Sequence, residues 1–363
     1  MKISRQKVDS KSQADSRSQV DSRSQVDSKS QIKTECALKK EFIHKSVLVD
    51  EIIKIAQVAF LGVKNPFMVD CTLGLGGHTL KFLQTFENLK VYGIDKDLEV
   101  KPIIQKRLSK YSNRFNFIHT DFSNLKIVKK KADFILMDLG ISSMQIDNAQ
   151  RGFSYMENAS LDMRMDLSQS ISAAKIINEY SYADLKEIFL LNGERNASRV
   201  AENIIKYREK SPIKTTEQLV KIADISIPRN SRSGHRAKKI FQALRIVVNN
   251  ELDNLKTALI QASELLNPGG VLAVIDYHSL EARIVKQFFR KLSSPAILLN
   301  LPKLPAGAQP EFELLPTVSP TEKEILANPR SASAHLRCIR KIKNAKNLVS
   351  KNGLISQKKA AGL

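Results

Sequence analysis

The sequence predicts an α/β fold in which a doubly wound parallel sheet is interrupted by an inserted helical region. Three observations predict it. Short apolar stretches that end at an aspartate alternate with segments of helical periodicity, the first stretch runs into a cluster of glycines, and the strand pattern disappears between Gln145 and about Val247. Apolar strands that alternate with helices are typical of parallel sheets covered on both faces.

The first elements follow from apolar spacing and from the positions of glycine and proline. Residues 47–61 place apolar side chains on one helical face, and Gly62 ends that helix. A strand over 67–70 leads into the glycine cluster, and a helix follows over about 78–87. Pro102 suits the first turn of the next helix, because its missing amide would have no partner there.

Three further strands complete this half of the sheet. Strand 91–94 ends at Asp95, strand 115–118 ends near Asp121, and strand 134–137 ends at Asp138. Open α/β sheets bind their ligands at the carboxyl ends of the strands. We therefore expect these aspartates to line one cleft.

The inserted region reads as helical and then returns to the sheet. The expected helices span 182–192 before Gly193, 197–209 before Pro212, 216–224 after the capping sequence 215–218, and one long helix over 236–266 that ends at the Asn267-Pro-Gly-Gly270 turn. A strand over 271–275 and a helix over 280–292 follow, separated by Asp276-Tyr-His-Ser279. We expect that segment to lie beside the cleft and the helical region to cover it.

The glycine cluster Gly74-x-Gly76-Gly77 indicates close approach of a ligand to the backbone, so that a side chain at Gly76 or Gly77 would occupy ligand space. The dinucleotide fingerprint would need another glycine where Thr79 stands, so S-adenosylmethionine fits better than NAD. Asp95 is placed to accept hydrogen bonds from both ribose hydroxyls.

The adenine of such a ligand could be held at the next strand end. Asp121 would accept from its exocyclic amine, and Phe122 would stack on the base. Each of these residues has an alternative role, as a strand-end cap or as a core aromatic.

Composition restricts the compartment and the partners. With 363 residues, 42% of them hydrophobic, the chain is long enough for a large buried core. It has neither a membrane-length apolar window nor the apolar centre of a signal peptide, and its three cysteines are too far apart in sequence for a Cys-x-x-Cys metal or redox motif. We expect a cytoplasmic protein with no metal and no membrane partner.

The positive charge is concentrated near the ends of the chain. Of the net charge of +21, residues 1–40 carry +5, residues 329–363 carry +9 and the rest carries +7. Such a distribution favours a polyanion as partner, because lysine and arginine displace counterions from phosphates, over a merely solvated tail.

Residues 1–40 include four copies of a hexad that begins with Asp9, Asp15, Asp21 and Asp27. With one apolar residue in six, the hexads cannot bury enough surface to offset chain entropy, so they predict a disordered tail. A hexapeptide β-helix is the alternative, but such folds use glycines that these copies lack.

Several motifs together carry a resemblance to a known family. They are Gly76-Gly-His78, Asp138-Leu-Gly-Ile-Ser-Ser143 with Gln145-Ile-Asp147, Arg151-Gly-Phe-Ser154, Leu161-Asp-Met-Arg-Met-Asp166, Phe241-Gln-Ala-Leu-Arg-Ile246 and His278-Ser-Leu-Glu281. From His44 to about Lys343 the chain resembles the bacterial 16S rRNA (cytosine-N4)-methyltransferase family. The resemblance implies a Rossmann-like class I methyltransferase domain that transfers methyl from S-adenosylmethionine to the exocyclic amine of a decoding-centre cytosine.

The resemblance also implies site residues and partners. Its cofactor contacts fall on Gly76, Gly77, His78, Asp95, Phe122, Asp138 and Gln145. The expected partner is the small ribosomal subunit or its 16S rRNA, and a homodimer is compatible with the sequence.

The expected chemistry needs a group that accepts a hydrogen bond from cytosine N4, whose lone pair is delocalised into the ring. Asp138 and His278 are the candidate catalytic residues, and His278 could instead cap the helix that starts beside it. Tyr277 or Phe153 could stack on the flipped base.

Basic residues at the start of the returning helix predict an RNA contact. Arg236, Lys238, Lys239 and Arg245, with His235 beside them, read as a phosphate-binding stripe, the alternative being a solvated face.

The expected division of the chain combines these readings. It is a low-complexity hexad-repeat tail over 1–40, a methyltransferase domain in two parts over 41–148 and 248–345, an inserted helical substrate-binding domain over 149–247, and a basic flexible tail over 346–363.

The sequence departs from the family pattern at two places. The usual Ile-Ser-Phe-His-Ser-Leu-Glu-Asp-Arg is Ile275-Asp-Tyr-His-Ser-Leu-Glu-Ala-Arg283 here, and Arg236 replaces a proline. If Ser279 caps the following helix, Ala282 fails to close the capping box, at a cost of ~1 kcal/mol or less.

Two alternative functions stay open at this stage. A DNA amino-methyltransferase would usually carry an Asp/Ser/Asn-Pro-Pro-aromatic motif at 138–141, which is Asp-Leu-Gly-Ile here. A non-catalytic RNA-binding or ribosome-assembly factor with a methyltransferase fold is the second alternative, and the altered segment 276–282 favours it.

Overall fold

The computed structural model describes residues 46–142, 144–145, 148–228, 234–294 and 310–342. The predicted hexad-repeat tail over 1–40 and the predicted basic tail over 346–363 lie outside these residues.

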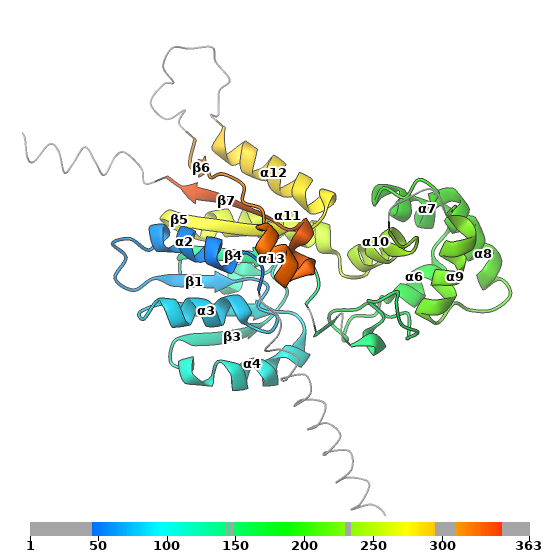
Figure 1. The fold of residues 1–363 in the computed structure, drawn as a ribbon, viewed down its shortest axis with the longest axis horizontal. Helices are drawn as coiled ribbons and strands as arrows, with labels where there is room; N and C mark the ends of the chain where they lie inside the picture. The colour runs from blue at the N-terminus through cyan, green and yellow to red at the C-terminus, as the bar shows by residue number, and fades with distance from the viewer. Residues whose placement is uncertain (1–45, 143, 146–147, 229–233, 295–309, 343–363) are drawn as a thin grey trace, which may run out of the picture. The chain divides into compact units, whose positions relative to one another are not determined.

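Seven described strands form one sheet with the order β3-β2-β1-β4-β5-β7-β6 (Figure 1). Their bounds are β1 Phe67–Asp70, β2 Lys90–Asp95, β3 Phe115–His119, β4 Ala132–Asp138, β5 Leu266–Asp276, β6 Phe312–Leu314 and β7 His335–Lys341. Strands β1 to β5 pair in parallel, whereas β7 runs antiparallel to β5 and to β6. The α/β doubly wound prediction is confirmed.

The chain reverses its direction of travel across the sheet between β1 and β4. It runs outward from β1 through β2 to β3 and then returns to place β4 on the other side of β1. Ligands of open α/β sheets bind at such a switch point. The turn after β1 and the carboxyl end of β4 flank it.

Five described helices pack on the sheet. They are α2 Val49–Ala59, α3 Gly77–Thr85, α4 Lys101–Arg107, α11 Glu251–Leu265 and α12 Ser279–Ser293. One core cluster joins α2, α3 and α4 to side chains such as Met68 and Phe134, and a second joins α11 and α12 to side chains such as Val69 and Ile135. Successive strand residues point to opposite faces, so both faces of the sheet are covered.

A separate group of helices lies between β4 and β5 in the chain (Figure 1). It comprises α6 Ala173–Glu179, α7 Tyr182–Leu191, α8 Ala197–Arg208, α9 Thr216–Ser226 and α10 Lys238–Val248. These helices share a core cluster of their own. Thr215 caps α9, and Gln218 closes the capping box that the sequence predicted.

The predicted long helix over 236–266 is wrong, because the chain breaks it into α10 and α11 at Asn249-Asn250. Asn250 has a left-handed backbone (φ 50°), and the Asn249 side chain reaches back to Met165 N at 2.8 Å and to Met163 O at 2.8 Å. The apolar periodicity continues across the break, but these hydrogen bonds end the helix. The predicted turn over 267–270 lies within β5 as an irregularity, because the pairing with β4 passes from Ala132↔Leu266 to Phe134↔Val271 and Gly269 has a φ of 88°.

The sequence reading also missed the last elements of the described chain. Strands β6 and β7, the helix α13 Glu322–Ala327 and the last of the described 3-10 turns follow α12. The short 3-10 turns are η1 Leu98–Val100, η2 Ser109–Tyr111, η3 Leu125–Ile127, η4 Ala149–Arg151 and η6 Pro329–Ser333. Part of the basic segment 329–363 is therefore a strand in the sheet.

Candidate functional site

Two aspartates hold the glycine turn after β1 from opposite sides. The Gly74 amide donates to Asp95 Oδ2 at 2.7 Å, and the Thr79 hydroxyl donates to the buried Asp70 Oδ2 at 2.7 Å. Burial raises the pKa of Asp70, although the hydrogen bond from Thr79 opposes it. Gly74 and Gly76 have φ values of 50° and 72°, a conformation that favours glycine.

The space beside Gly76 and Gly77 is filled by protein. A Cβ at Gly76 would lie 2.9 Å from Ile104 Cδ1, and one at Gly77 would overlap Ser46 Oγ. The Cβ directions at these glycines lead into neighbouring side chains, so a substitution would first displace protein groups, and the expectation that it would occupy ligand space stays a prediction. Close packing around the turn favours glycine at both positions, and the φ of 72° adds a second reason at Gly76.

Asp95 lies at the end of β2 with a backbone amide on each carboxylate oxygen. Besides the amide of Gly74, it accepts from Asp97 N at 2.9 Å. Burial raises the pKa of Asp95 to about 6, and the two amide hydrogen bonds limit the rise. A carboxylate has about four lone-pair sites, so both oxygens can still accept from ligand hydroxyls.

Asp138 at the end of β4 is a partly exposed carboxylate held by two neighbouring strands. Its backbone N–H donates to Thr72 Oγ1 at 2.6 Å, and its Oδ1 accepts from the Tyr277 hydroxyl at 2.8 Å. Its side chain keeps 25% of its surface exposed. One carboxylate oxygen is thus used within the protein, and the other lies 3.4 Å from His78 Nε2.

His78 is buried, with 6% of its surface exposed, and neither ring nitrogen has a hydrogen-bond partner among the described residues. Its Nε2 lies 3.4 Å from Asp138 Oδ2, without the geometry of a hydrogen bond. Buried polar groups are normally hydrogen-bonded, so an unpaired imidazole at the switch point fits a ligand that supplies the partner.

Gln145 joins the segment after β4 to the loop after β2. Its amide nitrogen donates to Asp97 Oδ2 at 2.9 Å, and its amide oxygen accepts from Ser142 N at 3.1 Å. Buried Arg151 reinforces the same loop, with its Nη1 3.3 Å from Asp97 and 2.5 Å from Glu99. The sequence reading missed Asp97 and the Arg151 ion pairs, although Asp97 stands only two residues after Asp95.

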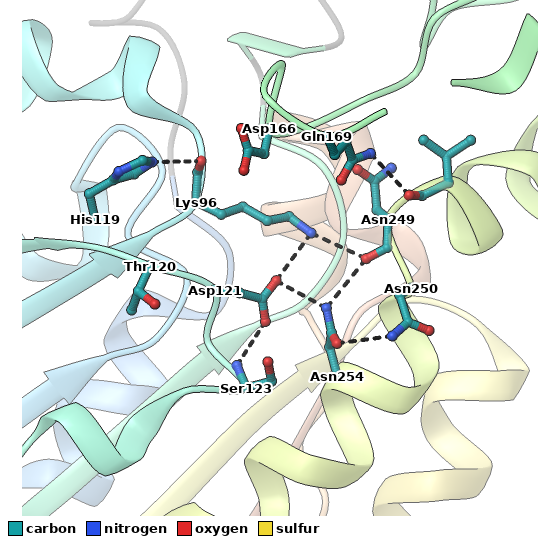
Figure 2. Close-up of a pocket in the computed structure, with 11 residues that line it drawn as sticks. Lys96, His119, Thr120, Asp121, Ser123, Asp166, Gln169, Asn249, Asn250 and Asn254 are labelled. Atoms are coloured by element: carbon teal, nitrogen blue, oxygen red, sulfur yellow. Dashed lines mark hydrogen bonds and ion pairs between the residues drawn. The ribbon is translucent and has the colours of Figure 1, made fainter. Parts of the chain in front are cut away.

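A polar pocket of about 410 Å³ lies at the end of β3 (Figure 2). Asp121 accepts from Ser123 N at 2.8 Å and from Asn254 Nδ2 at 3.0 Å, and Lys96 Nζ lies 3.4 Å from it. The further lining residues are His119, Thr120, Asp166, Gln169, Val248, Asn249 and Asn250. Phe122 is half-buried against the sheet core. An adenine amine that binds Asp121 would share its carboxylate with Ser123 N, Asn254 Nδ2 and Lys96 Nζ.

Asp276, Tyr277 and His278 of the altered segment after β5 are engaged within the protein. Asp276 is 1% exposed and pairs with Arg337 on β7, with Nε and Oδ2 2.6 Å apart. His278 is the N-cap of α12, and Glu281 closes a capping box with it. The expectation of a Ser279 cap weakened by Ala282 is therefore wrong, because the box is shifted by one residue.

Arg245 does not lie in an exposed stripe. Its guanidinium donates from Nε and Nη2 to the two oxygens of Glu251, each at 2.8 Å, and its side chain is 13% exposed. Both side chains of this pair are largely buried, so the prediction of an exposed phosphate contact for Arg245 is corrected. Phe153 is likewise buried in the helical core, which makes it a core aromatic.

Glu251, His278 and Glu281 bring their ligand atoms within 4.8 Å of one another. Burial alone would raise the pKa of Glu281, but the hydrogen bond from His278 and the nearby charges lower it. Arg245 occupies Glu251, and the Tyr277 and His278 amides donate to Glu281 Oε2. These carboxylates are therefore used within the protein.

The other three residues of the predicted stripe lie at the start of α10. Arg236 Nη1 donates to the carbonyl and the carboxylate of Asp224 at 2.9 and 3.0 Å, and Lys239 Nζ donates to Gly193 O at 2.6 Å. Lys238 is exposed. His235 stacks on Tyr155, with ring centroids 4.6 Å apart.

Residues 41–342 match the model of the MraW methylase family. The chain belongs to this family. Three of its relatives are named ribosomal RNA small subunit methyltransferase H. That of Bifidobacterium longum subsp. infantis is 42% identical over 82% of this chain and 86% of its own. That of Tropheryma whipplei strain Twist is 42% identical over 82% and 94%, and that of Oceanobacillus iheyensis is 43% identical over 83% and 95%.

Family membership confirms the resemblance predicted from the motifs. As a member of the MraW methylase family, the chain is a methyltransferase whose cofactor is S-adenosylmethionine. A putative methyltransferase from Streptococcus mutans, solved in complex with SAH, aligns with 14% identity and a TM-score of 0.38 over 80% of this chain and 97% of that one. That score is too low to add to the assignment.

The predicted cofactor residues gather at three strand ends of the MraW fold. Gly76, Gly77 and His78 follow β1, Asp95 ends β2 and Asp138 ends β4. Gln145 contacts the loop after β2 through its hydrogen bond to Asp97.

Of the residues described, none lies in a helix long and apolar enough to cross a membrane.

Proposed function

We propose that this MraW family member methylates the N4 amine of a cytosine in the decoding centre of 16S rRNA. The observation that carries the proposal is the Asp138 carboxylate at the switch point. It is partly exposed, its Oδ1 is bonded by Tyr277, and its Oδ2 lies beside the unpaired His78. The names of the relatives support rRNA of the small subunit as the substrate.

S-adenosylmethionine supplies an electrophilic methyl group when bound. The residues that would hold it are the glycine turn, His78, Asp95 for the ribose, Asp121 with Phe122 for the adenine, and Gln145 through the Asp97 loop. The unpaired His78 and the acceptor sites of Asp95 fit such a ligand.

The chain's own task is to position the amine and to accept its hydrogen. Cytosine N4 is a weak nucleophile, because its lone pair is delocalised into the ring. A carboxylate that accepts from N4–H localises that pair and can then take the proton to solvent. We assign this role to Asp138. His278 is better placed as the cap of α12, because it accepts from Glu281 N at 3.5 Å and its Nε2 lies 3.1 Å from Glu281 Oε1.

Arg236, Lys238 and Lys239 are the proposed phosphate contacts on the helical region. Replacing all three by Gln should weaken binding to small subunits and reduce the slope of log affinity against log salt by roughly 2.1 to 2.7, since each lost phosphate contact removes roughly 0.7 to 0.9. Filter binding over a salt series measures this slope.

A matched variant separates local contact from total charge. Lys175, Lys206 and Lys210 are exposed on other parts of the same helical region. Their triple replacement by Gln removes the same charge and should change the slope by less than 1. Equal slopes for the two variants would refute the basic stripe.

The proposal places the enzyme in the cytoplasm, with the small ribosomal subunit as partner. A homodimer remains compatible with it. The assembly-factor alternative rested on the altered segment 276–282. Because Asp276, Tyr277 and His278 are each engaged by a partner within the protein, no specific observation now favours that alternative.

The experiment that tests the proposal uses labelled S-adenosylmethionine with purified small subunits that lack the modification. Label should enter the 16S rRNA, and nuclease mapping should place it in a decoding-centre fragment. Label in large-subunit rRNA or in DNA alone would reject the substrate assignment, and cofactor binding without any transfer would select the assembly factor.

A further inference from the structure

Arg151 joins the loop after β2 to the inserted region, a connection that the proposed reaction does not use. Its Nη1 lies 3.3 Å from Asp97 Oδ2 and 2.5 Å from Glu99 Oε2. Its Nη2 donates to Arg164 O at 2.8 Å and to Met165 O at 2.9 Å. Arg151 and Met165 both lie in motifs that carry the family resemblance. One guanidinium therefore holds two segments of the chain together.

The two carbonyls belong to a strap, residues 160–166, that is anchored in the inserted region. The Asp162 carbonyl accepts from Ala173 N at 2.7 Å, at the start of α6. Met163 has a left-handed backbone with a φ of 62°, and its N–H donates to Arg151 O at 3.0 Å. A residue other than glycine keeps such a backbone only where its surroundings enforce it. Arg151 thus has a firmly held partner on the side of the inserted region.

Burial makes the geometry of this contact important. The side chain of Arg151 is 7% exposed and that of Asp97 is 3% exposed. A buried charge pair is favourable only when its geometry is good and its remaining donors and acceptors are satisfied. The guanidinium meets this condition, because it presents several donors in one planar fork, whereas the ammonium group of lysine is a compact point charge. A lysine at this position would keep the positive charge but could not hold the loop and the strap in the same way.

The contact reaches Asp95 through a single residue. Asp97 Oδ2 also accepts from Gln145 Nε2 at 2.9 Å, and the backbone N–H of Asp97 donates to Asp95 Oδ1 at 2.9 Å. The position of Asp97 therefore sets where one oxygen of Asp95 is anchored. We propose that Arg151 is a positioning residue for cofactor binding, which holds this loop against the strap so that Asp95 keeps the orientation that the ribose hydroxyls need. This inference rests on the proposed contact between Asp95 and the ribose.

The test is Arg151→Lys in the full-length protein, which keeps a positive charge beside Asp97 but removes the fork. Isothermal titration calorimetry should give a dissociation constant for S-adenosylmethionine about tenfold higher, the low end of what a hydrogen bond to a charged group contributes. At saturating cofactor, the single-turnover rate constant of methyl transfer to small subunits should stay within about threefold of the wild type. A role confined to stability would lower the melting temperature without changing the affinity of the folded protein.

Matched variants make the test specific. Arg164→Lys makes the same change in an arginine of the strap that pairs with Asp162 instead, with Nε and Oδ1 2.8 Å apart, and should leave the cofactor affinity within about twofold. Asp97→Asn cuts the proposed contact from the side of the loop and should weaken binding to a similar extent, so the test remains possible if Arg151→Lys does not fold. In the Asp97→Asn background, Arg151→Lys should have little further effect, because the two residues act through one contact. Circular dichroism melts confirm that each variant is folded at the assay temperature.

The possible results are distinguishable. A cofactor affinity of Arg151→Lys within about twofold of the wild type, an equal loss in Arg164→Lys, or a tenfold fall of the rate constant at saturating cofactor overturns the inference. If Asp95→Asn leaves the affinity unchanged, the proposed ribose contact fails instead. If the wild-type protein transfers no methyl group to cytosine N4, the proposed function fails, whereas the affinity measurements, which need no RNA, still test Arg151.

Discussion

Replacing Asp95 by Asn tests how the cofactor's ribose is held. Asp95 already accepts the amides of Gly74 and Asp97, one on each oxygen. Asn keeps the shape of the side chain, but it removes the charge and replaces one acceptor oxygen by a donor. Ala would be a poorer test, because it leaves both amides unpaired and would loosen the glycine turn as well.

The expected loss follows from the lost acceptor and charge. Hydrogen bonds to charged groups contribute roughly 1.5 to 3 kcal/mol each, so the loss of one corresponds to a roughly 10- to 150-fold weaker dissociation constant for S-adenosylmethionine. Isothermal titration calorimetry measures it. Thr79→Val, which cuts the opposite anchor of the turn on Asp70, controls for loosening of the loop and should change the affinity by less than about threefold.

The affinity should also depend on pH in a defined direction. The pKa of Asp95 is raised to about 6 by burial, so the carboxylate that accepts the ribose hydroxyls becomes protonated as the pH falls through 6. Below that value the wild-type affinity should fall by about tenfold per pH unit, whereas the Asn variant should show no such dependence. An Asp95→Asn affinity within tenfold of the wild type, with the same pH profile, would place the ribose elsewhere.

Two further predictions concern packing around the site. Gly77→Ala should lower the melting temperature and weaken S-adenosylmethionine binding, because its Cβ overlaps Ser46 Oγ. Adding Ser46→Ala in the same chain should restore most of the melting temperature and of the affinity. An affinity loss that survives in the double variant would support the explanation that a side chain at Gly77 occupies ligand space. Asp276→Ala should lower the free energy of unfolding by about 3 kcal/mol in denaturant titrations, because it strands Arg337 within a buried ion pair. Glu313→Ala, which removes the exposed ion pair with Arg340, should lower the free energy of unfolding by less than about 1 kcal/mol. Equal losses for Asp276→Ala and Glu313→Ala would show that burial of the ion pair does not set the loss of stability.

The strands that build the site could be predicted from sequence. The apolar stretches over 67–70, 91–94, 115–118 and 134–137 correspond to β1, β2, β3 and β4 within two residues at each end. Continuous burial on both faces leaves a plain signal in such strands. Their terminal aspartates could be placed at one edge for the same reason, because parallel strands share a carboxyl edge.

Arg245 was predicted to be exposed because residues 236–266 were predicted to form one continuous helix. In one continuous helix, residues 245 and 251 would point to different sides, so Arg245 would have no partner there. The break at Asn249-Asn250 turns Glu251 back toward it. The break depends on hydrogen bonds from Asn249 to residues more than 80 positions away, and no local pattern reports such contacts.

The contacts around segment 276–282 were also beyond the sequence. Asp276 finds its partner on β7, and Tyr277 finds its own on β4. Strand β7 was not predicted, so the arginine that neutralises Asp276 could not be named. The capping box was open to prediction, since His278 and Glu281 have the required spacing, but histidine is a less usual cap than the serine beside it.

The most direct test of the central claim is the identity of the modified nucleoside. Small subunits treated with the wild-type protein and S-adenosylmethionine are digested to nucleosides and analysed by mass spectrometry against authentic standards. The account predicts N4-methylcytidine, formed by the wild type and nearly absent with Asp138→Asn at saturating cofactor. A methyl group on cytosine C5, on a ribose or on another base, or undiminished N4-methylcytidine with Asp138→Asn, would contradict it.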